Sequence, residues 1–216
     1  MKCGRNVVMG LWLAAAAIGG AAAQANAADI VAEWAKVKPP PKPQLKNVQL
    51  DRPTTALLIL DIQKPGCTEQ RRPRCVETLG NIQTLLDSAR GLGVPVIYTF
   101  SRNDPQNVAD PALKPLAGEW IGRNGPDKFE GSDLDARLKA KGIKTVVVTG
   151  SSAQGAVLGT STGAALRGYK VIVPVDTISS EDPYQEQYTA WHLYKGGPAA
   201  VTAAVTLTRT DLIAFQ

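Results

Sequence analysis

The feature that most constrains the fold is an alternation of short apolar runs with segments of helical pattern. The expected strands are 54–62, 94–100, 145–150, 170–176 and 205–208, and the expected helices are 76–91, 133–141, 155–167 and about 184–194. The runs are rich in β-branched residues and apolar at nearly every position, which is typical of parallel strands buried on both faces. The predicted fold class is therefore α/β, a three-layer α/β/α sandwich with a mainly parallel sheet.

The N-terminus has the pattern of a secretory signal peptide. Lys2 and Arg5 precede an apolar run over 7–23, and the small-residue stretch AAAQANAAD follows it. The A-x-A rule places cleavage after Ala27, or two residues earlier. A retained membrane anchor is the alternative, but the run is short and Gly/Ala-rich and lacks a stop-transfer flank. Residues 1–27 are therefore predicted to be removed on export to the periplasm or beyond, with no stable membrane anchor left.

The remainder, residues 28–216, is long enough for one well-buried α/β domain and too short for two ordinary ones. Residues 28–49 form a Pro/Lys-rich N-terminal arm, in which KVKPPPKPQLKN is expected to be extended, and residues 50–216 form the domain. The formal net charge is +5, and it becomes smaller when Lys2 and Arg5 leave with the signal peptide. Such a mild excess gives no reason to expect a nucleic-acid partner.

The cysteine count agrees with export. Cys3 leaves with the signal peptide, so Cys67 and Cys75 remain as an even pair in a compartment that tolerates disulfides. A Cys67–Cys75 disulfide is predicted, with two free thiols or a metal pair as the alternatives. A metal is disfavoured because His192 is the only histidine. No metal or other cofactor is expected.

Ligands of open parallel sheets bind beyond the carboxyl ends of the strands. That rule directs attention to Asp61, to the glycine-rich turn 150–156 and to Asp176, each of which follows an expected strand. A carboxylate such as Asp61 is only partly solvated there and can exchange protons, although a helix cap is the commoner role. Backbone N–H groups of a glycine-rich turn that enters a helix can hold an oxyanion or a carboxylate. Lys128, in GPDKF, would by itself be interpreted as a surface charge.

Together, LLILDIQ, the lysine ahead of DLDARLKAKG, and TVVVTGSSAQGAVLGTSTGAALRGYKV resemble the isochorismatase-like (cysteine hydrolase) family in order and spacing. The resemblance spans roughly 54–180. It implies hydrolysis of a small molecule by a protein that associates with copies of itself. It also implies a cis peptide within 151–153. By the resemblance, the catalytic residues are Asp61 and Lys128, and the substrate-binding residues are Gln63, Ser151, Ser152 and Gly155.

The chain departs from this family at the nucleophile, because Ala156 occupies the position where most members have the catalytic cysteine. A methyl group can form no covalent intermediate. The family's isochorismatases resemble this pattern with a glycine there, and they cleave a vinyl ether by protonation without a nucleophilic side chain. We therefore expect an exported hydrolase that uses acid/base catalysis by Asp61 and Lys128. The alternative is a catalytically inactive member that binds a small ligand.

Three further features have structural interpretations as well as functional ones. The stripe of small residues over 155–164 most simply lets its helix approach the sheet closely. The arginines of 71–74 could attract an anionic substrate or form a solvated loop. Tyr184, Tyr188 and Trp191 recur at helical spacing and could line a pocket, pack in the core or form a subunit contact.

Overall fold

The computed structural model describes residues 28–101, 108–122 and 125–216. The predicted signal peptide, residues 1–27, lies outside the described residues. The chain divides into two compact units, Met1–Pro39 and Pro40–Gln216. In the first unit the described part holds the short helix α1 (Ile30–Glu33), whose N-cap Asp29 accepts a hydrogen bond from the Val31 N–H group. No helix of the described segments is long and apolar enough to cross a bilayer.

The second unit is built on a seven-stranded sheet in which every strand pair is parallel. Its order is β4-β3-β2-β5-β6-β8. β7 pairs with the carboxyl end of β5, past the part of β5 that pairs with β6. The strands are β2 (Thr55–Leu60), β3 (Val96–Thr99), β4 (Trp120–Gly122), β5 (Thr145–Ser151), β6 (Lys170–Pro174), β7 (Ile178–Ser179) and β8 (Val205–Thr208). The predicted mainly parallel sheet is confirmed.

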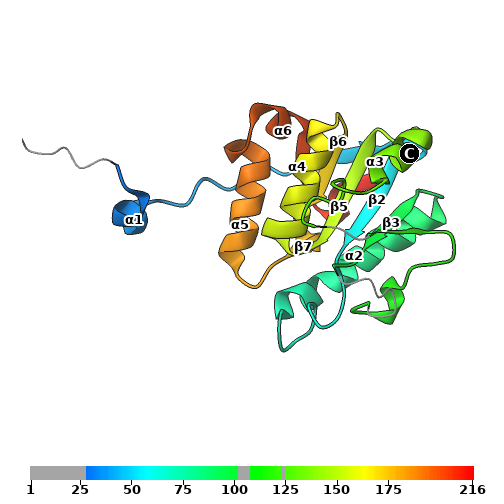
Figure 1. The fold of residues 1–216 in the computed structure, drawn as a ribbon, viewed down its shortest axis with the longest axis horizontal. Coiled ribbons are helices and arrows are strands. Elements are labelled where there is room, and N and C mark those ends of the chain that lie inside the picture. The colour runs from blue at the N-terminus through cyan, green and yellow to red at the C-terminus, as the bar shows by residue number, and fades with distance from the viewer. Residues whose placement is uncertain (1–27, 102–107, 123–124) are drawn as a thin grey trace, which may run out of the picture. The chain divides into compact units, whose positions relative to one another are not determined.

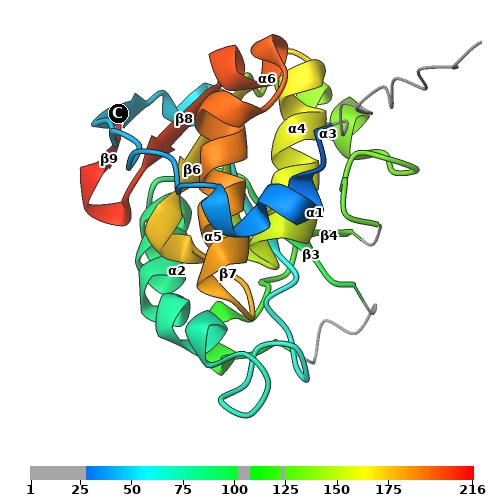
Figure 2. The same ribbon diagram turned by 90° about the vertical axis from the view of Figure 1, so that its left-hand side faces the viewer.

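Two apolar clusters lie on opposite faces of this sheet, beneath the helices that Figures 1 and 2 show on either side of it. Successive residues of a strand point to opposite faces, so Leu57 and Ile59 of β2 pack in one cluster and Leu58 and Leu60 in the other. The first cluster is completed by α2 (Pro73–Gly91) and the second by α3 (Leu134–Ala140), α4 (Leu158–Leu166) and α6 (Ala199–Ala204). In Figure 2, α5 (Pro183–Trp191) lies on the same side as α4 and α6. The three-layer α/β/α arrangement is confirmed.

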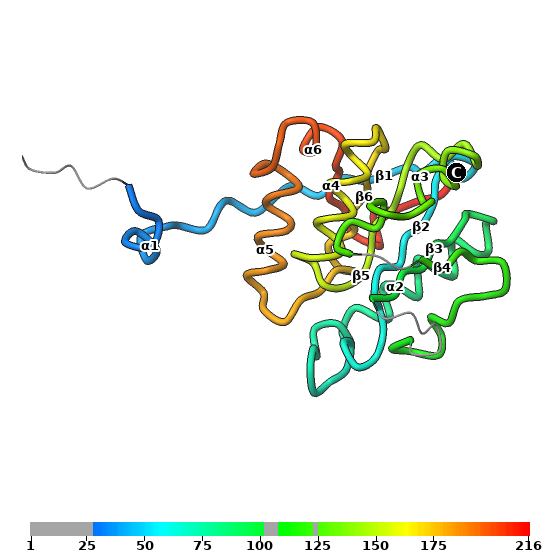
Figure 3. The backbone as a smooth tube through the Cα atoms, in the orientation of Figure 1, coloured from blue at the N-terminus to red at the C-terminus, as the bar shows by residue number. Residues whose placement is uncertain are grey.

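A second, two-stranded parallel sheet joins both ends of the unit. β1 (Val48–Leu50) pairs with β9 (Ile213–Phe215), and the tube in Figure 3 shows how the chain returns to make this contact. Sequence patterns did not predict β1, β4, β9 or α6. A three-residue strand is too short to show alternation, and its pairing depends on a partner distant in the chain. The expected arm 28–49 ends inside β1, and its boundary with the domain stays a prediction.

The helix predicted over 155–167 starts earlier than its pattern indicated. A π-helical turn, Ala153–Val157, leads directly into α4. A second π-helical turn, His192–Gly196, continues α5 beyond Trp191. π-helical turns inside longer helices frequently occur at functional sites. Here only Ser152 separates the end of β5 from the first of them, so the turn expected over 150–156 is divided between β5 and this π-helical turn.

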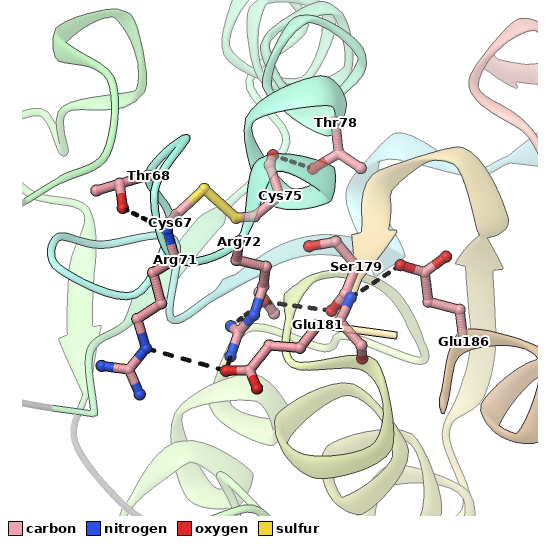
Figure 4. The surroundings of a disulfide bond; sticks show 11 residues. Cys67, Thr68, Arg71, Arg72, Cys75, Thr78, Ser179, Glu181 and Glu186 are labelled. Atoms are coloured by element: carbon pink, nitrogen blue, oxygen red, sulfur yellow. Dashed lines mark hydrogen bonds and ion pairs between the residues drawn. A yellow bond between two sulfur atoms is a disulfide. The ribbon is translucent and has the colours of Figure 1, made fainter. Parts of the chain in front are cut away.

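The predicted Cys67–Cys75 disulfide is present, with Cα atoms 5.3 Å apart (Figure 4). It closes the loop before α2, and both cysteines are buried. The same loop carries Arg72, whose guanidinium donates to the Ser151 hydroxyl over 2.6 Å. The disulfide therefore holds the loop that reaches the end of β5.

Removal of this disulfide is expected to lower the free energy of unfolding by about 2.5 kcal/mol, because the unfolded chain regains the entropy of a short closed loop. The measurement is urea unfolding of the wild type and of the double variant Cys67→Ser/Cys75→Ser. Reduced wild type is the matched control and should unfold at the same urea concentration as the variant. A variant as stable as the oxidised wild type would show that the bond adds nothing.

Candidate functional site

The site lies where the order of the sheet reverses. From β2 the chain first moves outward through β3 and β4, and then returns to the other side of β2 with β5. Such a switch point opens a crevice at the carboxyl ends of the two strands, the usual place for a ligand in an open α/β sheet. Leu60 and Gly150 are paired in register, so Asp61, which follows β2, and Ser151, the last residue of β5, lie side by side.

Asp61 and Lys128, which are far apart in sequence, meet at this edge. The Lys128 ammonium lies 2.7 Å from Asp61 Oδ2, and the Thr99 hydroxyl donates to Asp61 Oδ1 over 2.9 Å. The Lys128 side chain is 2% exposed and the Asp61 side chain 13%. Asp61 also has a positive φ of 55°, and its N–H group donates to the Thr99 carbonyl. The two predicted catalytic residues are therefore held together by a short, nearly buried ion pair.

This ion pair has a clear chemical capacity. Buried charges are retained where hydrogen bonds compensate for lost hydration, and both oxygens of the Asp61 carboxylate accept one. A carboxylate so placed can take a proton from a water molecule or a substrate. The adjacent ammonium can stabilise negative charge that develops nearby.

The end of β5 and the residues after it form the second part of the candidate site. Gly150 has φ 125°, and a cis peptide joins Ser151 to Ser152, within the range that the resemblance indicated. The buried Ser151 hydroxyl accepts from Arg72 and donates to the Ser179 carbonyl over 3.3 Å. A Cβ atom on Gly155 would lie only 2.7 Å from Ser152 Oγ, so this position admits no side chain without a shift.

Ala156 is buried in the π-helical turn that follows. It belongs to the same apolar cluster as Ala153 and Val157, and also as Phe129, the neighbour of Lys128. Its methyl group supplies no polar atom to this region. Gln63, two residues after Asp61, is buried, and its Oε1 atom has no hydrogen-bond partner among the described residues. An unpartnered buried acceptor is costly unless water or a ligand satisfies it.

An isochorismatase domain model matches residues 55–209 of this chain. The chain belongs to the isochorismatase family. N-carbamoylsarcosine amidase from Arthrobacter sp is 29% identical over 142 residues, which cover 53% of this chain and 53% of that protein. The chain therefore spans about half the length of that relative. The uncharacterised isochorismatase family protein YecD from Escherichia coli O157:H7 is 25% identical over 172 residues, 68% of this chain and 91% of that protein.

Solved structures share the fold. A cysteine hydrolase from Pseudomonas syringae pv. phaseolicola aligns with a TM-score of 0.65 at 21% identity, over 78% of this chain and 94% of that one. N-carbamoylsarcosine amidase from Thermoplasma acidophilum aligns with a TM-score of 0.60 at 24% identity, over 73% of this chain and 97% of that one. These likenesses establish the isochorismatase-type α/β fold.

Other candidates in this isochorismatase-family chain have partners away from Asp61. The Asp176 carboxylate accepts from the Thr210 N–H group over 3.0 Å and so anchors the C-terminal segment. Arg74 forms a two-contact ion pair with Glu186, and Arg71 lies 3.9 Å from Glu181. The arginines of 71–74 are thus tied to α5 and to the segment that enters it.

The aromatic residues of α5 are not core residues, because Tyr184, Tyr188 and Trp191 are all exposed. The interpretations as a pocket lining or a subunit contact remain. Within the described segments no three His, Cys, Asp or Glu side chains gather as metal ligands.

Sequence reasoning missed Thr99, and it considered Arg72 only as one of the arginines of 71–74, without its contact with Ser151. Thr99 ends β3 and is paired in register with Leu60, so its hydroxyl reaches the residue that follows Leu60. Aligning the ends of adjacent expected strands would have found it. Arg72 could not be found in this way, because its approach to Ser151 depends on the path of the disulfide loop.

Proposed function

We propose that this isochorismatase-family protein hydrolyses a small molecule through Asp61 and Lys128, without a cysteine nucleophile. The observation that carries the proposal is the 2.7 Å contact between Lys128 Nζ and Asp61 Oδ2 at the switch point of the sheet. Ala156, at the position that the resemblance assigns to the cysteine, has no atom that could attack a substrate.

In the proposed reaction, water is the nucleophile. As its oxygen bonds to the electrophilic carbon, Asp61 accepts a water proton and later returns it to the leaving group. Lys128 keeps its charge and stabilises the negative charge that forms on the substrate. Because both Asp61 oxygens already accept hydrogen bonds, the group is better arranged as a proton acceptor than as an acid toward a vinyl ether.

The name of the Arthrobacter relative points to N-carbamoyl compounds as a first substrate class, and small amides form a second. Vinyl ethers form a third class, which would need protonation by Asp61. Gln63, Ser151, Ser152 and Gly155 are proposed to contact the substrate. The unpartnered Oε1 atom of Gln63 suits a substrate N–H group.

The test is incubation of the wild type with these three classes in ¹⁸O-labelled water. We expect product that carries the label and, by intact-mass measurement during turnover, no covalent adduct on the protein. A compound that binds tightly and is recovered unchanged would instead establish the alternative, a catalytically inactive member that binds a small ligand.

The variant Ala156→Cys tests whether residue 156 faces the ion pair. A thiol beside Asp61 and Lys128 should react with iodoacetamide far faster than an ordinary thiol, since a neighbouring cation favours the thiolate. The mature form, which begins after Ala27, lacks Cys3, and the disulfide removes Cys67 and Cys75 from this reaction. Slow alkylation of the introduced thiol would show that residue 156 does not face Asp61 and Lys128.

We also propose that the protein acts in the periplasm or outside the cell, after cleavage near Ala27. The Cys67–Cys75 disulfide supports this location, because such bonds persist in oxidising compartments. Association with further copies of the chain is proposed as well, and the exposed aromatic residues of α5 are the surface we assign to it.

A further inference from the structure

Two glycines of the small-residue stripe, Gly159 and Gly163, face a loop that packs on α4. A Cβ atom on Gly159 would lie 2.8 Å from the Pro126 carbonyl, and one on Gly163 would lie 2.5 Å from Cγ of Asp127. Thr160, between them, donates to the Pro126 carbonyl over 3.1 Å. The stripe was expected to bring its helix close to the sheet, but at Gly159 and Gly163 the segment that approaches the helix is 126–127.

The packing of segment 126–127 on α4 also fixes the backbone of Lys128. The Thr160 hydroxyl accepts the Lys128 N–H group over 3.3 Å, and the Lys128 carbonyl accepts from the Ser132 hydroxyl over 2.7 Å. The Lys128 side chain is nearly buried, so its route to Asp61 is set by where its backbone lies. A displacement of the loop would therefore be passed on to the ammonium.

Arg167, at the end of α4, contacts the residues on both sides of Lys128. Its Nη1 group donates to the Gly163 carbonyl over 2.9 Å and to Asp127 Oδ2 over 3.3 Å. Its guanidinium carbon lies 5.0 Å from the centre of the Phe129 ring. Asp127 Oδ1 in turn accepts the Phe129 N–H group over 2.9 Å. One side chain thus fixes the residues before and after Lys128.

We propose that Arg167 is a positioning residue, which acts through Asp127 and Phe129 to hold Lys128 against Asp61. The inference rests on the proposed function for its kinetic consequence. The Arg167 and Asp127 side chains are 29% and 28% exposed, and a pair so solvated adds little to global stability. The pair instead fixes the position of Lys128, which lies between Asp127 and Phe129, relative to Asp61.

The first measurement needs no substrate. Acetic anhydride is added to the folded wild type and to Arg167→Gln, and labelling of Lys128 is followed by peptide mass spectrometry relative to the exposed Lys139. The variant should label Lys128 about tenfold faster, because the loop opens more often. Arg167→Lys, which keeps the charge but loses the planar fork, should fall between the two. Asp127→Asn is a second route to the same loosening.

Arg137→Gln is the matched control. Arg137 makes the same two kinds of contact, an ion pair with Asp133 and a cation–π contact with Trp120, but on α3. It should leave Lys128 labelling unchanged. The second measurement is turnover of the substrate found for the wild type, where Arg167→Gln should lower kcat about tenfold with little change in KM, as expected for a misplaced catalytic group.

Faster Lys128 labelling in Arg167→Gln and Asp127→Asn, with the melting temperature kept, supports the proposal. Unchanged labelling in both variants overturns it, and so does an equal rise in Arg137→Gln. Unchanged kcat despite faster labelling also overturns it, because the lysine would then have moved without consequence. If labelling rises while the wild type turns nothing over, the positioning role stands and the proposed function fails.

Discussion

Asp61→Asn is expected to lower kcat/KM by a factor of about 10² to 10⁴, the range typical of a lost general acid or base. The amide has nearly the same shape as the carboxylate. Its oxygen can still accept from either Lys128 or Thr99, which contact the two oxygens of Asp61 in the wild type. It cannot accept a proton from water at neutral pH. Ligand binding should therefore survive while turnover is lost.

Asp176→Asn is the matched control, because Asp176 also follows a strand of the same sheet but accepts from Thr210. Its activity should stay near that of the wild type. Thermal unfolding must accompany both measurements, since Asp61→Asn removes a negative charge that lies 2.7 Å from the buried Lys128 ammonium. A folded Asp61→Asn protein with full activity would remove Asp61 from the proposed mechanism.

Gly150→Ala is expected to destabilise the protein by more than about 4 kcal/mol, an effect that single substitutions rarely reach. Gly150 has φ 125°, in the region that side chains avoid. A Cβ atom there would lie 2.8 Å from the carbonyl carbon of Leu60 and still closer to its oxygen. Leu60 is the paired residue on β2, in the middle of the sheet, so neither strand can move away cheaply.

The contribution of space can be separated from that of φ with Gly93→Ala. Gly93 also has a positive φ, 72°, but an added Cβ would meet nothing within 4 Å. This control should lose only about 1–2 kcal/mol, the cost of a left-handed residue with a side chain. Urea unfolding of both variants gives the comparison. Equal losses would mean that the contact with Leu60 has no energetic weight.

Gly150 also links the fold to the candidate site. The pairing of Leu60 with Gly150 excludes a side chain at 150, and the same register sets Asp61 beside Ser151. Gly150→Ala should therefore disturb Asp61 in whatever fraction of the protein still folds. Its loss of activity per folded molecule is expected to accompany the loss of stability.

Much of the fold could be predicted because the central strands have strong local patterns. The runs that form β2, β5, β6 and β8 are apolar and rich in β-branched residues. Such runs are typical of strands in a parallel sheet that is buried on both faces. Helix termini were harder. The start of α4 is preceded by a π-helical turn that no periodicity reveals, and the two-stranded sheet of β1 and β9 depends on the two ends of the domain meeting.

The sequence by itself determined the fold class and the disulfide partners, and its resemblance to a family indicated the two residues that meet at the switch point. Apolar periodicity, cysteine count and motif order are properties of the linear sequence, and they do not depend on how the chain folds. Only the tertiary structure decided that Thr99 shares Asp61 with Lys128, that Arg72 reaches Ser151, and that the small residues of α4 receive the loop before Lys128. These contacts join segments far apart in the chain. A local sequence pattern does not predict which distant segments the folded chain brings together.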